Sequence, residues 1–360
     1  MRSSVRVAAI SISLALFGSA VGCATDDGIP TEGEPSTPVL GLVSHVDVTS
    51  DWLTKDDSVV VHWSVTNQGS TALALPRWQV PSADLESNVF AITRDGEPVR
   101  YYGKLAKRAA PTAADLVTIA PGATVAADVE LSKYYRMGHM GDYAIQHADL
   151  HLPVYVAGAP QLAELRSNVV ATLRSDENAN ADVPSVQADL VASGFQSCSS
   201  SQQTKLNTAL ASAQTYAQNA ETYMNSGTHG ARFTTWFGTY TSSRYSTVRS
   251  HYTNIRSAIQ SRKYTFNCSC SESGTYAYVY PDSPYTVYLC GAFWSAPNTG
   301  TDSRAGTLIH ESSHFTVLAG TNDWVYGQSG AKSLAKSNPT RAIDNADSHE
   351  YFAENNPQQQ

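Results

Sequence analysis

Two histidines, a glutamate and an aspartate lie within fourteen positions of the chain, a density that could serve a metal ion. His310, Glu311 and His314 form the pattern His-Glu-x-x-His. In a helix, positions i and i+4 share a face, so both imidazoles can reach one ion. Glu311 projects beside them, where it can deprotonate a metal-bound water. Zinc is the expected metal, because it takes histidine nitrogen and carboxylate oxygen with one position left open. The alternative is a solvent-exposed histidine pair on a surface helix.

A catalytic zinc needs a third protein ligand, and two acidic residues are candidates. The metzincin pattern is excluded, since Gly320 stands where that pattern has its third histidine. Glu350, 36 residues beyond His314, could serve in a thermolysin-like arrangement. Asp323 lies only nine residues beyond His314, and Gly320 can turn the chain back after the helix so that a short side chain reaches the metal. We therefore expect Asp323 to be the third ligand.

A second pair of acids follows near the end of the chain. Asp347 and Glu350 are three positions apart, so on a helix they share one face. Two carboxylates there could hold a lysine ammonium, a compact charge that accepts several oxygen partners. The alternative is the solvated acidic edge of a helix.

Composition limits the classes of protein that fit. The chain has 360 residues, of which 42% are hydrophobic and 16% charged, which is typical of a globular protein with room for two domains. The net charge is −8, and from Asp189 to the end 11 acidic residues balance 11 lysines and arginines. Because no basic block occurs anywhere, the sequence predicts no nucleic-acid partner.

The first 23 residues predict export. Arg2 and Arg6 precede a short apolar run that is too short to span a membrane comfortably, followed by small residues, as in a signal peptide. Cys23 ends an imperfect lipoprotein box, so lipidation at Cys23 and simple signal cleavage both remain open. Residues 24–38 are rich in proline, glycine and acid and predict a flexible tether.

The other four cysteines all lie in the second half of the chain, which in an exported protein predicts two disulfides. A zinc cluster fits less well, because Cys268 and Cys270 are separated by one residue. Each of these two should therefore pair with a distant partner. The four cysteines are Cys198, Cys268, Cys270 and Cys290.

Two regions of different pattern follow the tether. Residues 39–174 carry short alternating runs and turn signals, including Asp95-Gly96, and predict an all-β, immunoglobulin-like antiparallel sandwich. Residues 175–193 are polar and acidic and predict a linker. Residues 194–360 predict a mainly helical, α+β domain of zincin type: residues 200–227 have a helical hydrophobic face, and residues 275–294 resemble a tyrosine-rich hairpin.

The second region resembles the aspzincin metallopeptidases, the family of deuterolysin and peptidyl-Lys metalloendopeptidase. HESSH followed by GTxDxxYG carries the resemblance, and it is closer to the peptidyl-Lys branch over residues 194–360. Further matching segments are "CSSSQQ", "RFTTWFGTYTSSRYSTV", "YAYVYPDSPYTVYLCGAFW", "TGTDSRAGTLIHESSHF" and "NADSHEYFAENNP".

The resemblance implies roles for individual residues. His310, His314 and Asp323 would hold one zinc ion, Glu311 would be the catalytic base, and the Tyr326 hydroxyl would stabilise the transition state. Asp347 and Glu350 would form the pocket for lysine on the carboxyl side of the cut; deuterolysins resemble this segment but lack the second acid. The resemblance also implies disulfides Cys198–Cys268 and Cys270–Cys290.

The sequence therefore predicts a secreted or outer-surface zinc endopeptidase that acts, as a monomer, on lysine-containing proteins. The sandwich would be a pro-domain acting in cis or a retained accessory domain, and membrane attachment would occur only through Cys23. Two alternatives remain open: a deuterolysin-like protease of broader specificity, and a surface lipoprotein whose sandwich binds a partner.

Overall fold

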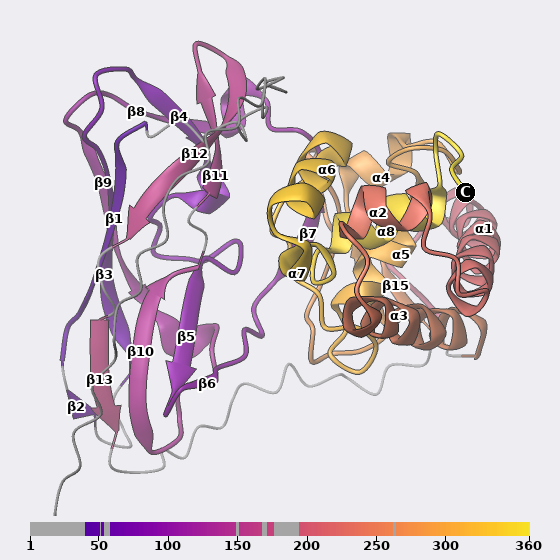
Figure 1. The fold of residues 1–360 in the computed structure, drawn as a ribbon, viewed down its shortest axis with the longest axis horizontal. Coiled ribbons are helices and arrows are strands. Elements are labelled where there is room, and N and C mark those ends of the chain that lie inside the picture. The colour runs from indigo at the N-terminus through magenta and orange to yellow at the C-terminus, as the bar shows by residue number, and fades with distance from the viewer. Residues whose placement is uncertain are drawn as a thin grey trace, which may run out of the picture. The chain divides into compact units, whose positions relative to one another are not determined.

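The structure is a computed structural model that describes residues 40–50, 52–53, 58–148, 151–167, 171–175, 194–261 and 264–360 (Figure 1). The predicted signal segment 1–23 with Cys23, the tether 24–38 and nearly all of the linker 175–193 lie outside the described residues. Among the residues described, no helix is long and apolar enough to cross a membrane.

The N-terminal region, up to Ser175, consists of two sheets, one with strand order β8-β4-β11-β12-β1-β3-β9 and one with order β2-β13-β10-β5-β6. Its strands are β1 (Leu42–Val48), β2 (Trp52–Leu53), β3 (Val60–Asn67), β4 (Leu73–Pro76), β5 (Phe90–Arg94), β6 (Glu97–Pro98), β8 (Leu116–Ile119), β9 (Thr124–Glu130), β10 (Gly141–His147), β11 (His151–Val156), β12 (Ala159–Ser167) and β13 (Ala171–Ser175). Short 3-10 turns occupy Arg77–Gln79, Ala113–Asp115 and Leu131–Lys133.

The alternating sequence runs form strands because every second side chain enters the core. In β3, Val61, Trp63 and Val65 are buried between more exposed neighbours. The predicted Asp95-Gly96 turn joins β5 to β6, and both residues have positive φ, as a tight hairpin turn requires. Two strand pairs, β1–β12 and β13–β2, are parallel, so the region departs from a purely antiparallel sandwich.

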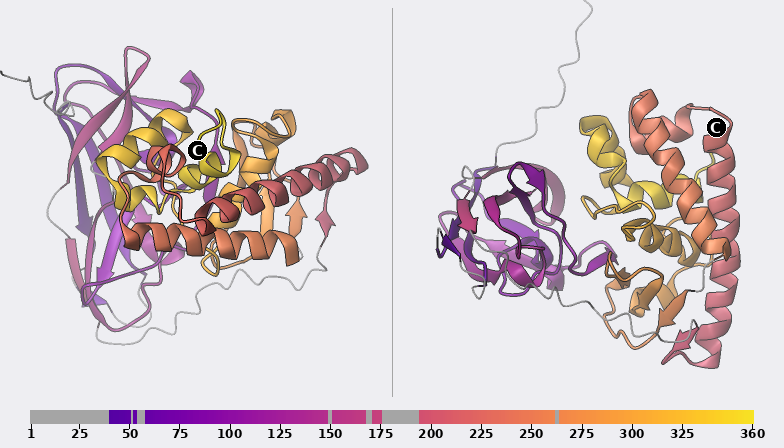
Figure 2. Two further views of the ribbon diagram at one scale, coloured as in Figure 1. Left: turned by 45° about the vertical axis from the view of Figure 1, so that its right-hand side comes forward. Right: turned by 90° about the horizontal axis from the view of Figure 1, so that it is seen from below.

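The C-terminal region packs helices on a five-stranded sheet of order β14-β15-β17-β16-β7. Its helices are α1 (Ser200–Asn225), α2 (Ala231–Phe237), α3 (Ser242–Ser261), α4 (Gly291–Ser295), α5 (Arg304–His314), α6 (Gly327–Ser337), α7 (Pro339–Ala342) and α8 (Ala346–Glu354). Its strands are β14 (Phe195–Gln196), β15 (Thr265–Asn267), β16 (Thr275–Val279) and β17 (Thr286–Leu289). Helices α1 and α3 lie side by side (Figure 2).

The helix and the tyrosine-rich hairpin predicted for this region are both present. Ser199 caps α1 and forms a capping box with Gln202, and the helix ends before Gly227, whose φ is positive. The tyrosine-rich run forms the antiparallel β16–β17 hairpin, in which Tyr278 stacks on Tyr288. Both disulfides form as the resemblance implied, Cys198–Cys268 and Cys270–Cys290.

Strand β7 (Leu105–Arg108) crosses the predicted domain boundary. It belongs to the N-terminal region by sequence, yet it pairs antiparallel with the edge strand β16 of the C-terminal sheet. Each region has its own hydrophobic core, but residues Thr37–Gln360 form one compact unit. The division into domains at residues 175–193 therefore remains a prediction.

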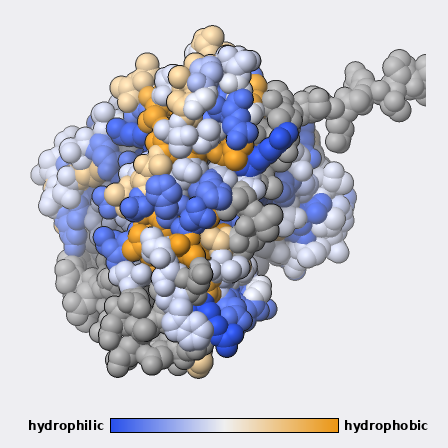
Figure 3. All heavy atoms as spheres, turned by 90° about the vertical axis from the view of Figure 1, so that its left-hand side faces the viewer, coloured by the Kyte–Doolittle hydropathy of each residue, from blue (hydrophilic) through white to orange (hydrophobic). Residues whose placement is uncertain are grey.

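One face of the N-terminal region is shown in Figure 3. Side chains coloured as hydrophobic form a broken band there, interrupted by hydrophilic ones. Large apolar side chains such as Trp52 and Met140 are about half exposed. Scattered exposed apolar residues are ordinary on folded proteins, and we assign no binding role to them.

Candidate active site

Helix α5 carries the His-Glu-x-x-His residues, and its first turn is fixed from two sides. Ser303 is the N-cap and accepts a hydrogen bond from the Gly306 amide at 2.9 Å. The Ser303 hydroxyl and amide both donate to Oε1 of Glu354, which lies at the end of α8. Gly306 faces the same carboxylate, and a Cβ there would collide with it. Glycine and serine at these positions therefore let α5 pack closely against α8.

Three ligand-type atoms converge beside α5. His310 Nε2 lies 3.2 Å from His314 Nε2, and Asp323 Oδ1 lies 3.1 and 3.3 Å from these two nitrogens. All three side chains are almost fully buried. A tetrahedral zinc about 2.1 Å from each ligand atom would separate the ligand atoms by about 3.4 Å, so the three residues fit this metal. The His314 Nδ1 atom contacts the Thr321 carbonyl at 2.8 Å, which orients the ring.

A short loop and two residues far along the chain position Asp323. Gly320 has φ +63°, so it turns the chain back after α5 as expected from the sequence. Asn345 Oδ1 accepts hydrogen bonds from the amides of Trp324 and Val325. Asp344 Oδ2 accepts from the Trp324 indole and from the Asn322 amide group, and burial raises the pKa of Asp344 to about 6. These contacts show that Asn345 and Asp344 hold the Asp323 loop in place. Nothing in the spacing of the sequence indicates this role.

Glu350, the alternative third ligand, lies on the other side of the His310 ring. Its Oε2 is 3.4 Å from His310 Nδ1, whereas His314 and Asp323 meet Nε2. Asp347 also approaches Nδ1, at 2.8 Å. Among the described residues, Glu350 is therefore not the third ligand around His310 Nε2, as a thermolysin-like site would require. The His310 ring lies between two groups: His314 and Asp323 at Nε2, and Asp347 and Glu350 at Nδ1.

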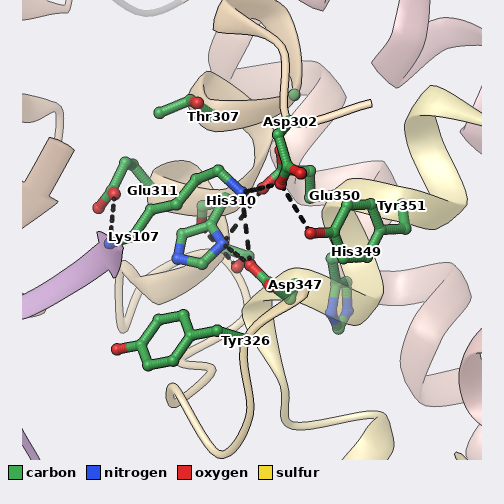
Figure 4. Close-up of polar contacts among 12 residues, drawn as sticks. Lys107, Asp302, Thr307, His310, Glu311, Tyr326, Asp347, His349, Glu350 and Tyr351 are labelled. Atoms are coloured by element: carbon green, nitrogen blue, oxygen red, sulfur yellow. Dashed lines mark hydrogen bonds and ion pairs between the residues drawn. The ribbon is translucent and has the colours of Figure 1, made fainter. Parts of the chain in front are cut away.

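Glu311 and Tyr326 contact the two sides of one peptide bond, the bond between Ala106 and Lys107 of β7. Lys107 N donates to Glu311 Oε1 at 3.2 Å (Figure 4). The Tyr326 hydroxyl donates to the Ala106 carbonyl at 3.0 Å. The Ala106 amide donates to Asp323 Oδ2 at 3.0 Å. Burial raises the pKa of Glu311 to about 7. Burial also raises the pKa of Tyr326, so its hydroxyl stays protonated and can donate.

Asp347 and Glu350 share one face of α8, as predicted, and they hold a lysine of the chain itself. Lys107 Nζ lies 2.7 Å from Glu350 Oε2 and 3.6 Å from Asp347 Oδ1, and all three side chains are buried (Figure 4). Burial alone would lower the pKa of Lys107, but the charges of Asp347 and Glu350 raise it well above its ordinary value. Burial raises the pKa of Glu350, whereas Lys107 and His310 outweigh burial and lower that of Asp347.

His349, between the two acids in sequence, points away from them (Figure 4). Its Nε2 lies 3.0 Å from Nδ1 of His251, and its Nδ1 contacts the Asn345 carbonyl. Two rings complete the surroundings of the Lys107 ammonium, with centroids 5.1 Å away for Tyr276 and 5.6 Å away for Tyr351. Lys107 and Tyr276 were missed from the sequence, because nothing in the spacing of residues ties β7 or β16 to α8. Tyr351 was also missed, although it follows Glu350 directly on α8.

A helix with two histidines, an aspartate that converges on them, and a peptide strand lying across the cluster define the class of metal-dependent peptidases. A family model described as "Lysine-specific metallo-endopeptidase" matches residues 222–354. The chain belongs to this family, the aspzincins, and is a zinc metalloendopeptidase.

Similar proteins cover most of the chain. An "Extracellular protease" of Aeromonas hydrophila is 40% identical over 316 residues, covering 84% of this chain and 89% of that protein. A "Peptidyl-Lys metalloendopeptidase" of Grifola frondosa is 38% identical over 371 residues, covering 97% of this chain and 99% of that protein. Among solved structures, a zinc peptidase from Grifola frondosa is 57% identical, with TM-score 0.44, covering 45% of this chain and all of that one.

Proposed function

We propose that this enzyme hydrolyses peptide bonds on the amino side of lysine. One observation carries the proposal: while the Lys107 side chain fills the acidic pocket of Asp347 and Glu350, the peptide bond on its amino side contacts Glu311 and Tyr326. Strand β7 also runs antiparallel to the edge strand β16, a common way for a peptide to be held in a cleft. The name of the Grifola frondosa relative supports the same specificity.

Each catalytic residue would act at an atom of the scissile bond. His310, His314 and Asp323 would hold the zinc, which when bound polarises the carbonyl and the attacking water. Glu311 would accept the proton of the water and pass it to the leaving nitrogen, which in β7 is the atom that contacts its carboxylate. Tyr326 would donate a hydrogen bond to the carbonyl oxygen as negative charge develops on it.

The test of this specificity is a mass-spectrometric map of new N-termini in a denatured protein. The digest uses the full chain supplied with zinc, in parallel with its Lys107→Ala variant and with a chelator. New termini that begin with lysine and disappear with the chelator are the expected result. Chelator-sensitive cuts without a preference for lysine would instead support the deuterolysin-like alternative.

The N-terminal region would act as a pro-domain that blocks the cleft in cis. Besides the backbone contacts of Ala106 and Lys107, several side chains tie the two regions together around the site. Lys104 pairs with Glu272 at 2.6 Å, Arg136 pairs with Asp282 at 2.7 Å, and Asn88 donates to Asn322 at 2.8 Å. These contacts favour an inhibitory pro-domain over an accessory domain that leaves the cleft free, and over a surface lipoprotein that uses the sandwich to bind a partner.

Removing the lysine side chain should release this inhibition. We expect the intact Lys107→Ala chain, loaded with zinc, to cleave a lysine peptide at least tenfold faster than the intact wild-type chain, because β7 loses its buried ion pairs and substrate displaces it more easily. Lys133→Ala is the matched control, since Lys133 pairs with Glu130 of its own region. Initial rates, with chain integrity checked by mass, measure the effect; equal rates for wild type and Lys107→Ala would refute inhibition by this lysine.

Export would bring the enzyme to its protein substrates. The similar protein of Aeromonas hydrophila is named an extracellular protease, and two disulfides suit an oxidising compartment. We propose secretion on these grounds, with attachment through a lipid at Cys23 as the alternative that intact-mass measurement of the exported protein would reveal.

A further inference from the structure

A third carboxylate reaches the ammonium group in the pocket. Asp302 Oδ1 lies 3.0 Å from Lys107 Nζ, and this contact has the geometry of a hydrogen bond donated by the ammonium (Figure 4). The contacts of the same nitrogen with Glu350 and Asp347 are close ion pairs without that geometry. Asp302 is thus the carboxylate to which the ammonium is best aligned, although the sequence pattern singled out only the other two.

Asp302 is held in place from the helix that carries the other two acids. The Tyr351 hydroxyl donates to Asp302 Oδ1 at 2.7 Å, and Tyr351 follows Glu350 directly on α8. On its other side Asp302 precedes Ser303, whose side chain caps α5. Asp302 has φ +51°, a conformation that aspartate and asparagine tolerate better than most residues. The carboxylate therefore has a fixed position beside the ammonium, and the Asp302 side chain is 40% exposed.

We propose that Asp302 is a specificity-determining residue that selects lysine at the position following the cut. This inference rests on the proposed cleavage before lysine. A lysine ammonium has three N–H donors, and Asp302, Asp347 and Glu350 offer it carboxylates from two segments of the chain. A guanidinium is planar and spreads its donors over a fork, so carboxylates that converge on a single nitrogen, at 2.7 to 3.6 Å from Lys107 Nζ, suit it less well.

The experiment compares Asp302→Asn with its parent in the full chain carrying Lys107→Ala and zinc. Two matched peptides are used as substrates, differing only in lysine or arginine after the scissile bond. We expect kcat/KM for the lysine peptide to fall about tenfold, mainly through KM, because asparagine keeps an acceptor oxygen but loses the charge that pairs with the ammonium. The arginine peptide should change less than threefold. Tyr351→Phe, which removes only the hydroxyl that orients Asp302, should lower lysine cleavage about threefold.

A second measurement does not depend on activity. In the full chain with Lys107 intact, Asp302→Asn should speed hydrogen exchange of the Leu105–Arg108 amides several-fold, while bound zinc and Tm stay as in the wild type. Unchanged lysine kinetics with unchanged exchange would overturn the proposal, as would an equal loss for both peptides, which indicates a structural role. If the parent enzyme shows no preference for lysine, the proposed function is wrong. The hydrogen-exchange data would then decide separately whether Asp302 holds the Lys107 side chain.

Discussion

Glu311→Gln should abolish most peptide cleavage while leaving the metal site and the fold in place. Glutamine keeps the size of the side chain and an oxygen that can accept the contact now made to Lys107 N, but it cannot take a proton from water. We expect kcat/KM to fall by about 10³- to 10⁴-fold, which is the range for loss of a positioned general base. Zinc content should not change, because the converging ligand-type atoms belong to His310, His314 and Asp323.

Kinetics and metal analysis of the same samples check this prediction. The full chain with Lys107→Ala is the parent for both variants, so that no lysine of the chain itself fills the acidic pocket. Glu221→Gln is the control, since it makes the same chemical change in a carboxylate of α1 that pairs with Arg256. Control activity should stay within twofold of the parent. Retention of a tenth or more of the parent activity by Glu311→Gln would assign the base to another residue.

Glu350→Gln should remove the preference for lysine without removing the metal. The carboxylate is fully buried and lies 2.7 Å from the ammonium of Lys107, so its replacement leaves a buried positive charge short of a partner. Breaking a buried ion pair in this way costs about 3 to 5 kcal/mol, which corresponds to a loss of about 10²- to 10³-fold or more in cleavage before lysine. Cleavage before an uncharged residue of similar length should fall far less.

Asp347→Asn should affect both zinc binding and lysine selection, whereas Glu350→Gln should affect lysine selection alone. Asp347 Oδ1 is 3.6 Å from the Lys107 ammonium but 2.8 Å from His310 Nδ1, so it contacts a proposed zinc ligand as well as the lysine. We therefore expect Asp347→Asn to weaken zinc binding about 10- to 100-fold, in addition to lowering lysine cleavage. Zinc titration and paired kinetics of the two variants measure this difference. If both variants keep the full preference for lysine, the acids are not the pocket that selects it.

Local patterns in the sequence determined much of this protein. Alternation of apolar residues determined where the strands of the N-terminal region form. The capping box at Ser199 starts α1, and Gly227 follows its end. The spacing of His310 and His314 put both rings on one face of α5, and the spacing of Asp347 and Glu350 did the same on α8. These features depend on contacts between near neighbours, which the order of residues fixes directly.

Only the tertiary structure decided which residue lies against Asp347 and Glu350. Lys107 belongs to a region whose pattern predicts a separate sandwich, and nothing local ties it to α8, 240 residues further on. In the sequence, Asp302 and Asp344 likewise look like ordinary acidic residues of loops. Their roles appear only in the fold, where Tyr351 contacts Asp302 and Trp324 contacts Asp344. Strand pairing between β7 and β16, and burial of one ammonium among three carboxylates, are long-range contacts. Their free energy arises only when distant segments meet, so no window of sequence reveals them.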